Sequence, residues 1–212
     1  MRKSCSLFIL TLIMGPALFA SPFHIGIEGT FGTSIGTGKG NWDWTDPALG
    51  IQRSAPPNMG AALMILYDLS PVFQLETGAG YYWNKCTVAN GDEVWTYKQE
   101  SLEFPLAIRL FFNRDSRGLY AKGGTALILL TGKSSYRNEN SGEDQFISDV
   151  PENKAHAGLQ IGIGYQRELK KMLWELEAKY ITFYSSPDYK RSDGSTADTR
   201  FHRMALNFGL FF

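Results

Sequence analysis

The chain has 212 residues, which suits one domain or at most two, and 43% of them are hydrophobic, which argues against general disorder. Its 21 basic and 21 acidic side chains give a formal net charge of zero, so no nucleic acid partner is expected. Aromatic residues make up 14% of the chain and glycine occurs 22 times, a combination that favours many β-strands over a helical bundle.

The first twenty residues have the pattern of an export signal. Arg2 and Lys3 form a basic start, residues 7–14 form an apolar stretch, and residues 17–20 lead to cleavage before Ser21. The alternative is a helical membrane anchor, but the apolar stretch is too short to cross a bilayer as a helix. We predict that residues 1–20 are a signal peptide and that residues 21–212 form the mature domain.

The two cysteines are Cys5 and Cys86. After cleavage only Cys86 remains, so the sequence predicts no internal disulfide. Cys5 also precedes the apolar stretch, whereas a lipid-anchored cysteine would follow it, so lipid anchoring is not expected. The mature chain has no run of eighteen apolar residues and predicts no transmembrane helix.

Eight segments of the mature chain alternate apolar side chains with polar or small ones. The first places Phe23, Ile25 and Ile27 on one face and Gly26 and Glu28 on the other. A period of two indicates β-strands, because a helical period would scatter these sets around the axis. In chain order the segments span residues 23–35, 58–68, 73–84, 102–112, 119–129, 156–166, 174–180 and 203–212.

The second segment is the least informative, since Met64 and Leu66 make its other face apolar as well. Most of the segments are longer than ordinary globular strands, which have about five or six residues. They match the length of a tilted strand that crosses a bilayer, about nine to eleven residues. The segment lengths therefore favour a membrane barrel over a soluble sandwich.

The connections alternate strictly between short and long. Short ones follow the second, fourth and sixth segments, at residues 68–71, 113–118 and 168–172. Longer polar stretches follow the first, third, fifth and seventh, at residues 37–57, 86–98, 132–153 and 185–200. This pattern is typical of transmembrane barrels with short periplasmic turns and long outer loops. The sequence therefore predicts an all-β fold, an eight-stranded antiparallel up-and-down transmembrane β-barrel.

The apolar faces are expected to point outward, because an eight-stranded barrel encloses too little volume to bury them. The other face would then fill the interior, where charges of both signs must pair with one another. The candidate interior charge network is Glu28, Glu76, Glu103, Arg109, Lys122, Glu175, Glu177, Lys179 and Arg203. Glycines on the same face, at 26, 60, 78, 80, 124, 158, 162, 164 and 209, are expected to leave room for these long side chains.

Aromatic side chains lie near the ends of several segments on the outward face. Amphipathic rings at such positions suit the two interfaces of a bilayer. The residues concerned are Tyr67, Tyr81, Trp83, Tyr165, Trp174, Tyr180 and Phe212.

The chain ends in the alternating sequence Asn207-Phe208-Gly209-Leu210-Phe211-Phe212. This ending resembles the recognition signal of the bacterial outer-membrane assembly machinery, with Gly209, Leu210 and Phe212 as the candidate assembly signal. Residues 102–106 and 173–180 resemble strands of small OmpX/PorT-like outer-membrane β-barrels, a resemblance that covers residues 23–212. It implies a barrel in the cell outer membrane with membrane lipid and the assembly machinery as partners, and it transfers no active site.

Some small barrels modify lipids, so the three histidines are candidates for catalytic groups. His202 would share the outward face with Met204 and border the lipid headgroups, near serines at 185, 186, 192 and 195. No motif singles out one of these serines as a nucleophile. Glu175 and Glu177 could form an acid/base pair, but neutralisation by neighbouring cations is the favoured interpretation. No catalytic residue, cofactor or metal site is predicted, and the expected protein is not an enzyme.

The outer loops are the best functional candidates, because a rigid barrel displays them to the surroundings. Trp42, Trp44 and Asp46 are the candidate contacts for an extracellular protein or host ligand. The leading hypothesis is a non-enzymatic barrel for adhesion, surface interaction or envelope stabilisation. The first alternative is a narrow channel or a lateral gate for small, often apolar molecules, at the glycine-rich segments 156–166 and 73–84. A lipid-modifying enzyme is the third hypothesis.

Overall fold

The computed structural model describes residues 22–39, 52–54, 57–90, 93–113, 117–138, 144–146, 155–183, 188–190 and 196–212. The predicted signal peptide lies outside these ranges. No helix within them is long and apolar enough to cross a bilayer.

The described chain forms one sheet with eight long strands and three short ones. The long strands are β1 (Phe23–Lys39), β3 (Pro57–Asp68), β4 (Phe73–Asn90), β5 (Glu93–Phe111), β6 (Gly118–Asn138), β8 (Ala155–Leu169), β9 (Met172–Phe183) and β11 (Thr196–Phe211). The short strands are β2 (Gln52–Ser54), β7 (Asp144–Phe146) and β10 (Asp188–Lys190). Each of the eight predicted segments lies within one long strand or ends one residue beyond it.

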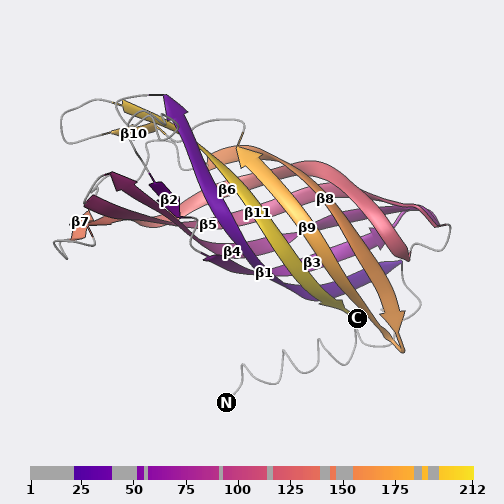
Figure 1. Ribbon diagram of the computed structural model, residues 1–212. Helices are drawn as coiled ribbons and strands as arrows, with labels where there is room; N and C mark the ends of the chain where they lie inside the picture. The colour runs from indigo at the N-terminus through magenta and orange to yellow at the C-terminus, as the bar shows by residue number, and fades with distance from the viewer. Residues whose placement is uncertain are drawn as a thin grey trace, which may run out of the picture.

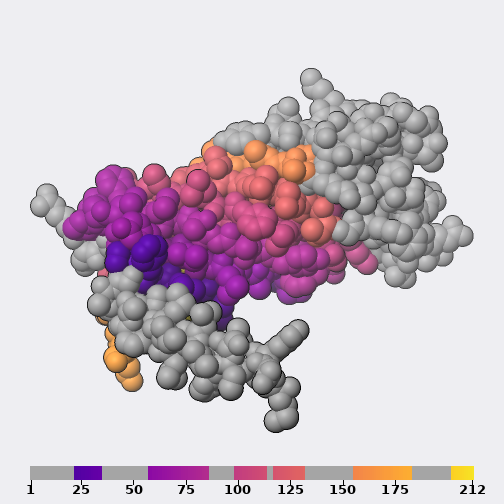
Figure 2. Space-filling model, turned by 180° about the vertical axis from the view of Figure 1, so that it is seen from behind, coloured from indigo at the N-terminus to yellow at the C-terminus, as the bar shows by residue number. Residues whose placement is uncertain are grey.

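The long strands pair antiparallel in chain order, and β1 pairs with β11 to close the sheet. The closing register runs from Gly26 opposite Phe211 to Lys39 opposite Asp198. Figure 1 shows β1, β11, β9 and β8 side by side, and Figure 2 shows the opposite wall, made mainly of β3 to β6. The predicted eight-stranded antiparallel barrel is confirmed. In the described residues, closure pairs every long strand with a neighbour on each side along the barrel wall, as a lipid environment requires.

Three short turns join the long strands at one end of the barrel, as predicted. They connect β3 to β4, β5 to β6 and β8 to β9. In the first turn, the amides of Val72 and Phe73 donate hydrogen bonds to the Ser70 hydroxyl oxygen, at 3.3 and 3.1 Å. In the last, Lys170 has a backbone φ of 61°, in the left-handed region.

The opposite end contains more strand than the sequence predicts. The stretch 86–98 was expected to be a loop, yet β4 and β5 continue through it as a paired hairpin, up to Asn90 opposite Glu93. β6 likewise continues to Asn138, and β2, β7 and β10 pair onto β4, β6 and β11 at this end (Figure 1). These stretches were predicted to be loops because they are polar. A strand that extends into water beyond the bilayer can, however, carry polar side chains on both faces.

Side-chain orientation follows the predicted alternation around the wall. On β3, whose two faces the sequence left ambiguous, Leu63 is 64% exposed while Met64 is 1% exposed. The inward face of β3 is therefore apolar from Ala62 to Leu66, and neighbouring strands supply most of the polar groups inside the barrel.

Candidate functional site

The nine residues of the interior charge network all lie inside the barrel. None of them is more than 6% exposed. Five are glutamates and four are lysines or arginines, so these charges nearly balance.

The centre of the network is Arg109 on β5. Its guanidinium lies 2.6 Å from a carboxylate oxygen of Glu76 and 2.5 Å from one of Glu175. Lys122 on β6 lies 2.9 Å from Glu76 and 2.6 Å from Glu177. These bonds connect β4, β5, β6 and β9 across the interior. Two neutral groups complete the set, since the Tyr120 hydroxyl and the Asn207 amide donate to Glu177 at 2.9 and 3.1 Å.

Two further ion pairs lie closer to the outer end. Arg203 donates two hydrogen bonds to the Glu103 carboxylate, at 2.6 and 2.5 Å, and Lys179 lies 3.2 Å from Glu28. The ring of Tyr82 contacts both cations, with the Arg203 guanidinium 4.2 Å and the Lys179 ammonium 5.8 Å from its centre. A two-bond arginine–carboxylate pair is geometrically specific as well as strong.

The interior glycines accommodate large aromatic rings more than charged side chains. A Cβ atom on Gly60 or Gly80 would collide with the Tyr82 ring, and one on Gly164 would collide with Tyr120. Gly26 and Gly209 make the same room for Phe211. Tyr82 and Phe211 are interior groups that were not predicted from the sequence. The sequence does contain the signal for this, because each residue lies two positions from an inward glycine, Gly80 or Gly209, and residues two apart on a strand share a face.

Apolar clusters lie at both ends of the central ion pairs. Along β9, Leu173 comes first, then Glu175, Glu177 and Lys179, and then Ile181. Leu173 belongs to a cluster with Ala62, Met64, Leu66 and Phe211, and Ile181 to a cluster with Ala126, Ile128 and Leu130. Ion pairs, aromatic rings and these clusters fill the interior, so it leaves no room for a wide aqueous pore.

A concave surface lies on the outer wall. This lateral groove has a volume of about 950 Å³ and crosses β3, β1, β11, β9 and β8. Its lining residues are Phe31, Gly32, Thr33, Pro57, Ile161, Gly162, Ile163, Ala178, Lys179, Tyr180, Met204, Ala205 and Leu206. The groove borders the glycine-rich segment 156–166, where a lateral opening was considered, but not segment 73–84.

The three histidines lie at separate places. His24 is 3.2 Å from the Asp68 carboxylate beside the turns, and His156 faces the interior. The Nδ1 atom of His202 is 2.6 Å from the Tyr180 hydroxyl, with which it is hydrogen-bonded. The serines considered as nucleophiles lie outside the described residues. Within the described ranges, no three His, Cys, Asp or Glu side chains form a metal-binding group.

The remaining predicted residues lie in the loops and at the C-terminus. Trp42, Trp44 and Asp46 are outside the described residues. Gly209 faces the interior, while Phe212 is exposed on the outside and exchanges two backbone hydrogen bonds with Ile25, at 2.9 and 3.1 Å. The proposed assembly signal is thus part of the seam that closes the barrel, and its recognition stays a prediction.

No protein-family profile matches the chain, and no curated protein matches it in sequence. Among solved structures, the outer membrane protein OprG from Pseudomonas aeruginosa is similar, with 12% identity, coverage of 90% of this chain and 95% of that chain, and a TM-score of 0.48. Neisserial surface protein A has 11% identity, coverage of 91% and 98%, and a TM-score of 0.46. Ail, the attachment invasion locus protein of Yersinia pestis, in complex with the heparin analogue sucrose octasulfate, has 12% identity, coverage of 90% and 99%, and a TM-score of 0.39.

Three features of the molecule define its architecture. The sheet closes on eight long strands, the outward side chains are apolar, and the inward charges are paired. A soluble protein of this size would bury its apolar rows and expose its charges. The chain therefore has the architecture of the small eight-stranded transmembrane β-barrels.

Proposed function

We propose that this protein is a non-enzymatic barrel of the bacterial outer membrane that presents its outer end for adhesion or another surface interaction. The observation that carries the proposal is the filled interior, in which paired charges and aromatic rings occupy the space that a channel would need. What remains available for function is the surface of the barrel and its outer end.

Aromatic pairs on the outer wall support a membrane location. Phe23 and Tyr67 contact each other beside the turns, with ring centres 4.5 Å apart. Tyr81 and Trp83 form a second pair towards the outer end, with ring centres 5.0 Å apart. Outward-facing apolar residues such as Leu63 lie between these two levels on β3 and β4. Two aromatic girdles around an apolar band are typical of outer-membrane barrels.

The extended outer end supports display. The β4–β5 hairpin continues past Trp83, and β6 and β11 also extend at this end. A paired extension on a rigid barrel would hold the outer connections, including the one with Trp42, Trp44 and Asp46, away from the membrane surface. Export by the predicted signal peptide is a further part of the proposal.

The display proposal is tested by replacing Trp42, Trp44 and Asp46 together by alanine. Cells that produce this variant should lose adhesion to host cells or to extracellular matrix proteins, while the purified barrel keeps its heat-modifiable gel migration. The matched control replaces Ser192, Asp193 and Ser195 by alanine and should adhere normally. Unchanged adhesion of the tryptophan variant would remove these residues from the proposal.

The second candidate function is passage of small apolar molecules through the wall, which the lateral groove favours. Since apolar molecules carry no current, single-channel recordings in planar bilayers test whether the barrel also has a path for ions. The display proposal expects no stepwise conductance from the purified protein, and reproducible conductance steps would overturn it.

A further inference from the structure

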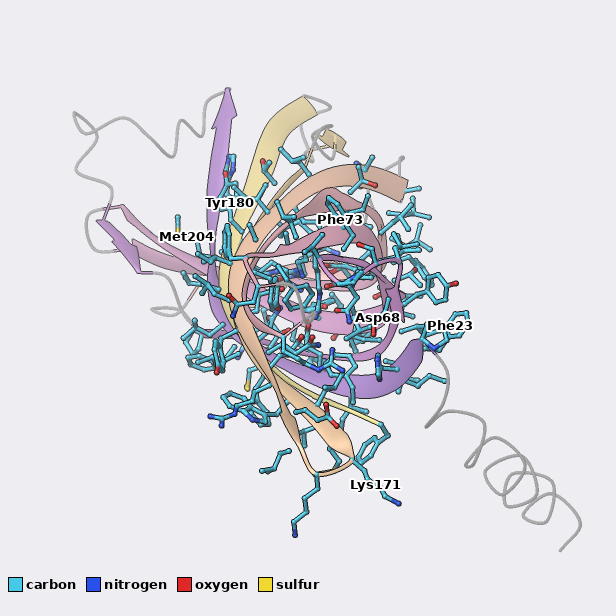
Figure 3. The ribbon with its side chains drawn as sticks, turned by 90° about the vertical axis from the view of Figure 1, so that its right-hand side faces the viewer. Phe23, Asp68, Phe73, Lys171, Tyr180 and Met204 are labelled. Atoms are coloured by element: carbon cyan, nitrogen blue, oxygen red, sulfur yellow. The ribbon has the colours of Figure 1, made fainter. Side chains whose placement is uncertain are left out.

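The lateral groove consists of two transverse rows of outward side chains. In the first row, strand pairing places Tyr180 between Ile161 and Met204, and Thr33 between Met204 and Pro57. In the second, Ala178 lies between Ile163 and Leu206, and Leu206 lies opposite Phe31. Figure 3 shows Tyr180 and Met204 on the outside of the barrel.

Small outward side chains account for the depression in this part of the outer surface. Ala178 is flanked on both neighbouring strands by larger apolar residues, and Thr33 by Met204 on β11. Beneath them the seam is tight, because a Cβ atom on Gly32 would collide with Ala205. Two short side chains over a close-packed seam leave a depression bordered by Ile163, Leu206 and Phe31.

The groove lies in the outer half of the apolar band. Along β9 from the turn end, Trp174 comes first, followed by Leu176, Ala178 and Tyr180. Tyr180 is hydrogen-bonded to His202, and the two rings stack with an interplanar angle of 17°. The groove is therefore lined mainly by apolar side chains, and at its end nearest the outer surface stands Tyr180 with its hydrogen-bonded neighbour His202.

We propose that the lateral groove binds the acyl chains of one lipid from the outer leaflet, with the lipid's polar linkage beside Tyr180 and His202. The hollow opens sideways into the layer where the surrounding medium is hydrocarbon, and its walls are apolar side chains. Tyr180 and His202 stand at the depth where an outer-leaflet lipid carries its ester and headgroup oxygens. This inference goes beyond display and does not depend on it.

The test uses the full mature barrel, refolded in lipid-free detergent and titrated with a diacyl phosphatidylethanolamine. Native mass spectrometry then counts the lipids that stay bound. The unmodified protein should retain one lipid with an affinity clearly above that of further lipids. Ala178→Phe fills the second row and should weaken this first site at least tenfold.

The matched control is Ala79→Phe, which puts the same ring on the outward face of β4, away from the groove. It should bind lipid as the unmodified protein does. Heat-modifiable migration shows that each variant is folded, and cell adhesion of Ala178→Phe should stay normal, which separates this inference from the display proposal. Equal binding by Ala178→Phe, equal loss in both variants, or no retained lipid on the unmodified protein would each overturn it.

A second variant tests the polar end. Tyr180→Phe keeps the ring and removes the hydroxyl, so the phospholipid should bind roughly threefold more weakly or worse. Binding of hexadecane, which has no polar linkage, should not change. If both probes lose affinity alike, the polar contact is wrong. If the groove instead mediates a lipid-free dimer that Ala178→Phe abolishes, the occupant is a second copy and the lipid proposal fails.

Discussion

Arg109 illustrates how a single interior residue stabilises this barrel. Its guanidinium is fully buried and contacts carboxylates from two strands, Glu76 on β4 and Glu175 on β9. Glu175 is 66 residues away along the chain, so this contact ties distant strands together. Such a group neutralises charges that are already buried. Its effect on stability therefore becomes visible when one partner is removed and the other stays buried without a counter-charge.

Replacement of Arg109 by methionine should therefore lower the free energy of unfolding by about 3–5 kcal/mol, because it leaves buried carboxylates without their cation. Denaturant titration of the refolded protein, followed by gel mobility, measures this change. Arg167→Met, at an exposed position, is the control and should stay within about 0.5 kcal/mol. A loss below about 1 kcal/mol for Arg109→Met would mean that the network relaxes around the missing charge.

Lys170 offers the opposite case, a residue whose replacement should stabilise the protein. Its φ of 61° is costly for any side chain other than glycine, asparagine or aspartate. Lys170→Gly should raise the free energy of unfolding by about 0.5–1 kcal/mol. Lys171→Gly, in the same turn, should not stabilise. If both variants behave alike, backbone strain at Lys170 is not the cause.

At the scale of elements, several interior aromatic rings lie against glycines on neighbouring strands, where a side chain would have no room. Gly164 on β8 lies directly against the Tyr120 ring on β6. Gly123 faces outward and has no atom of another segment within 4 Å of the place where its Cβ would stand. The two glycines therefore have opposite tolerance for a side chain.

Gly164→Val should destabilise the barrel by about 1–3 kcal/mol through overpacking against Tyr120. Gly123→Val adds the same side chain to open space and should be nearly neutral. Denaturant midpoints of the two variants, compared with the unmodified protein, provide the measurement. Combining Gly164→Val with Tyr120→Leu should recover part of the loss, and independent effects would contradict the proposed contact.

At the scale of the whole molecule, Phe212 extends the pairing of β1 with β11 that closes the barrel. Phe212 exchanges two backbone hydrogen bonds with Ile25, while its side chain is exposed on the outside. Its backbone thus takes part in closure, and we predict that the assembly machinery recognises its side chain. The two roles can be separated.

Phe212→Ala keeps the backbone bonds and removes the ring. We expect normal refolding of the purified variant in detergent and reduced insertion in cells, measured as the folded fraction in membrane extracts. Phe112→Ala, also at the turn end and exposed, is the control and should insert normally. Equal insertion of both variants would show that the terminal ring is not part of the recognition signal.

The sequence alone predicted the long strands, the sides they present and the short turns, because each depends on local periodicity. It underestimated the strands at the outer end, since polar composition resembles a loop when the membrane boundary is not known. Residues 86–98 are the clearest example. The two-residue alternation of each strand was enough to place the nine charged residues inside the barrel. It could not assign which of them pair with one another.

Local sequence pattern and tertiary structure thus decided different features of this protein. The alternation of apolar and polar side chains decided which face of each strand meets lipid, because successive side chains of a strand point to opposite faces. Only the closed sheet decided that Arg109 meets Glu175, that Tyr82 lies between two cations, and that Ala178 and Thr33 lie in one groove. These contacts join residues far apart in the chain, and they depend on strand register and tilt, which no local pattern encodes.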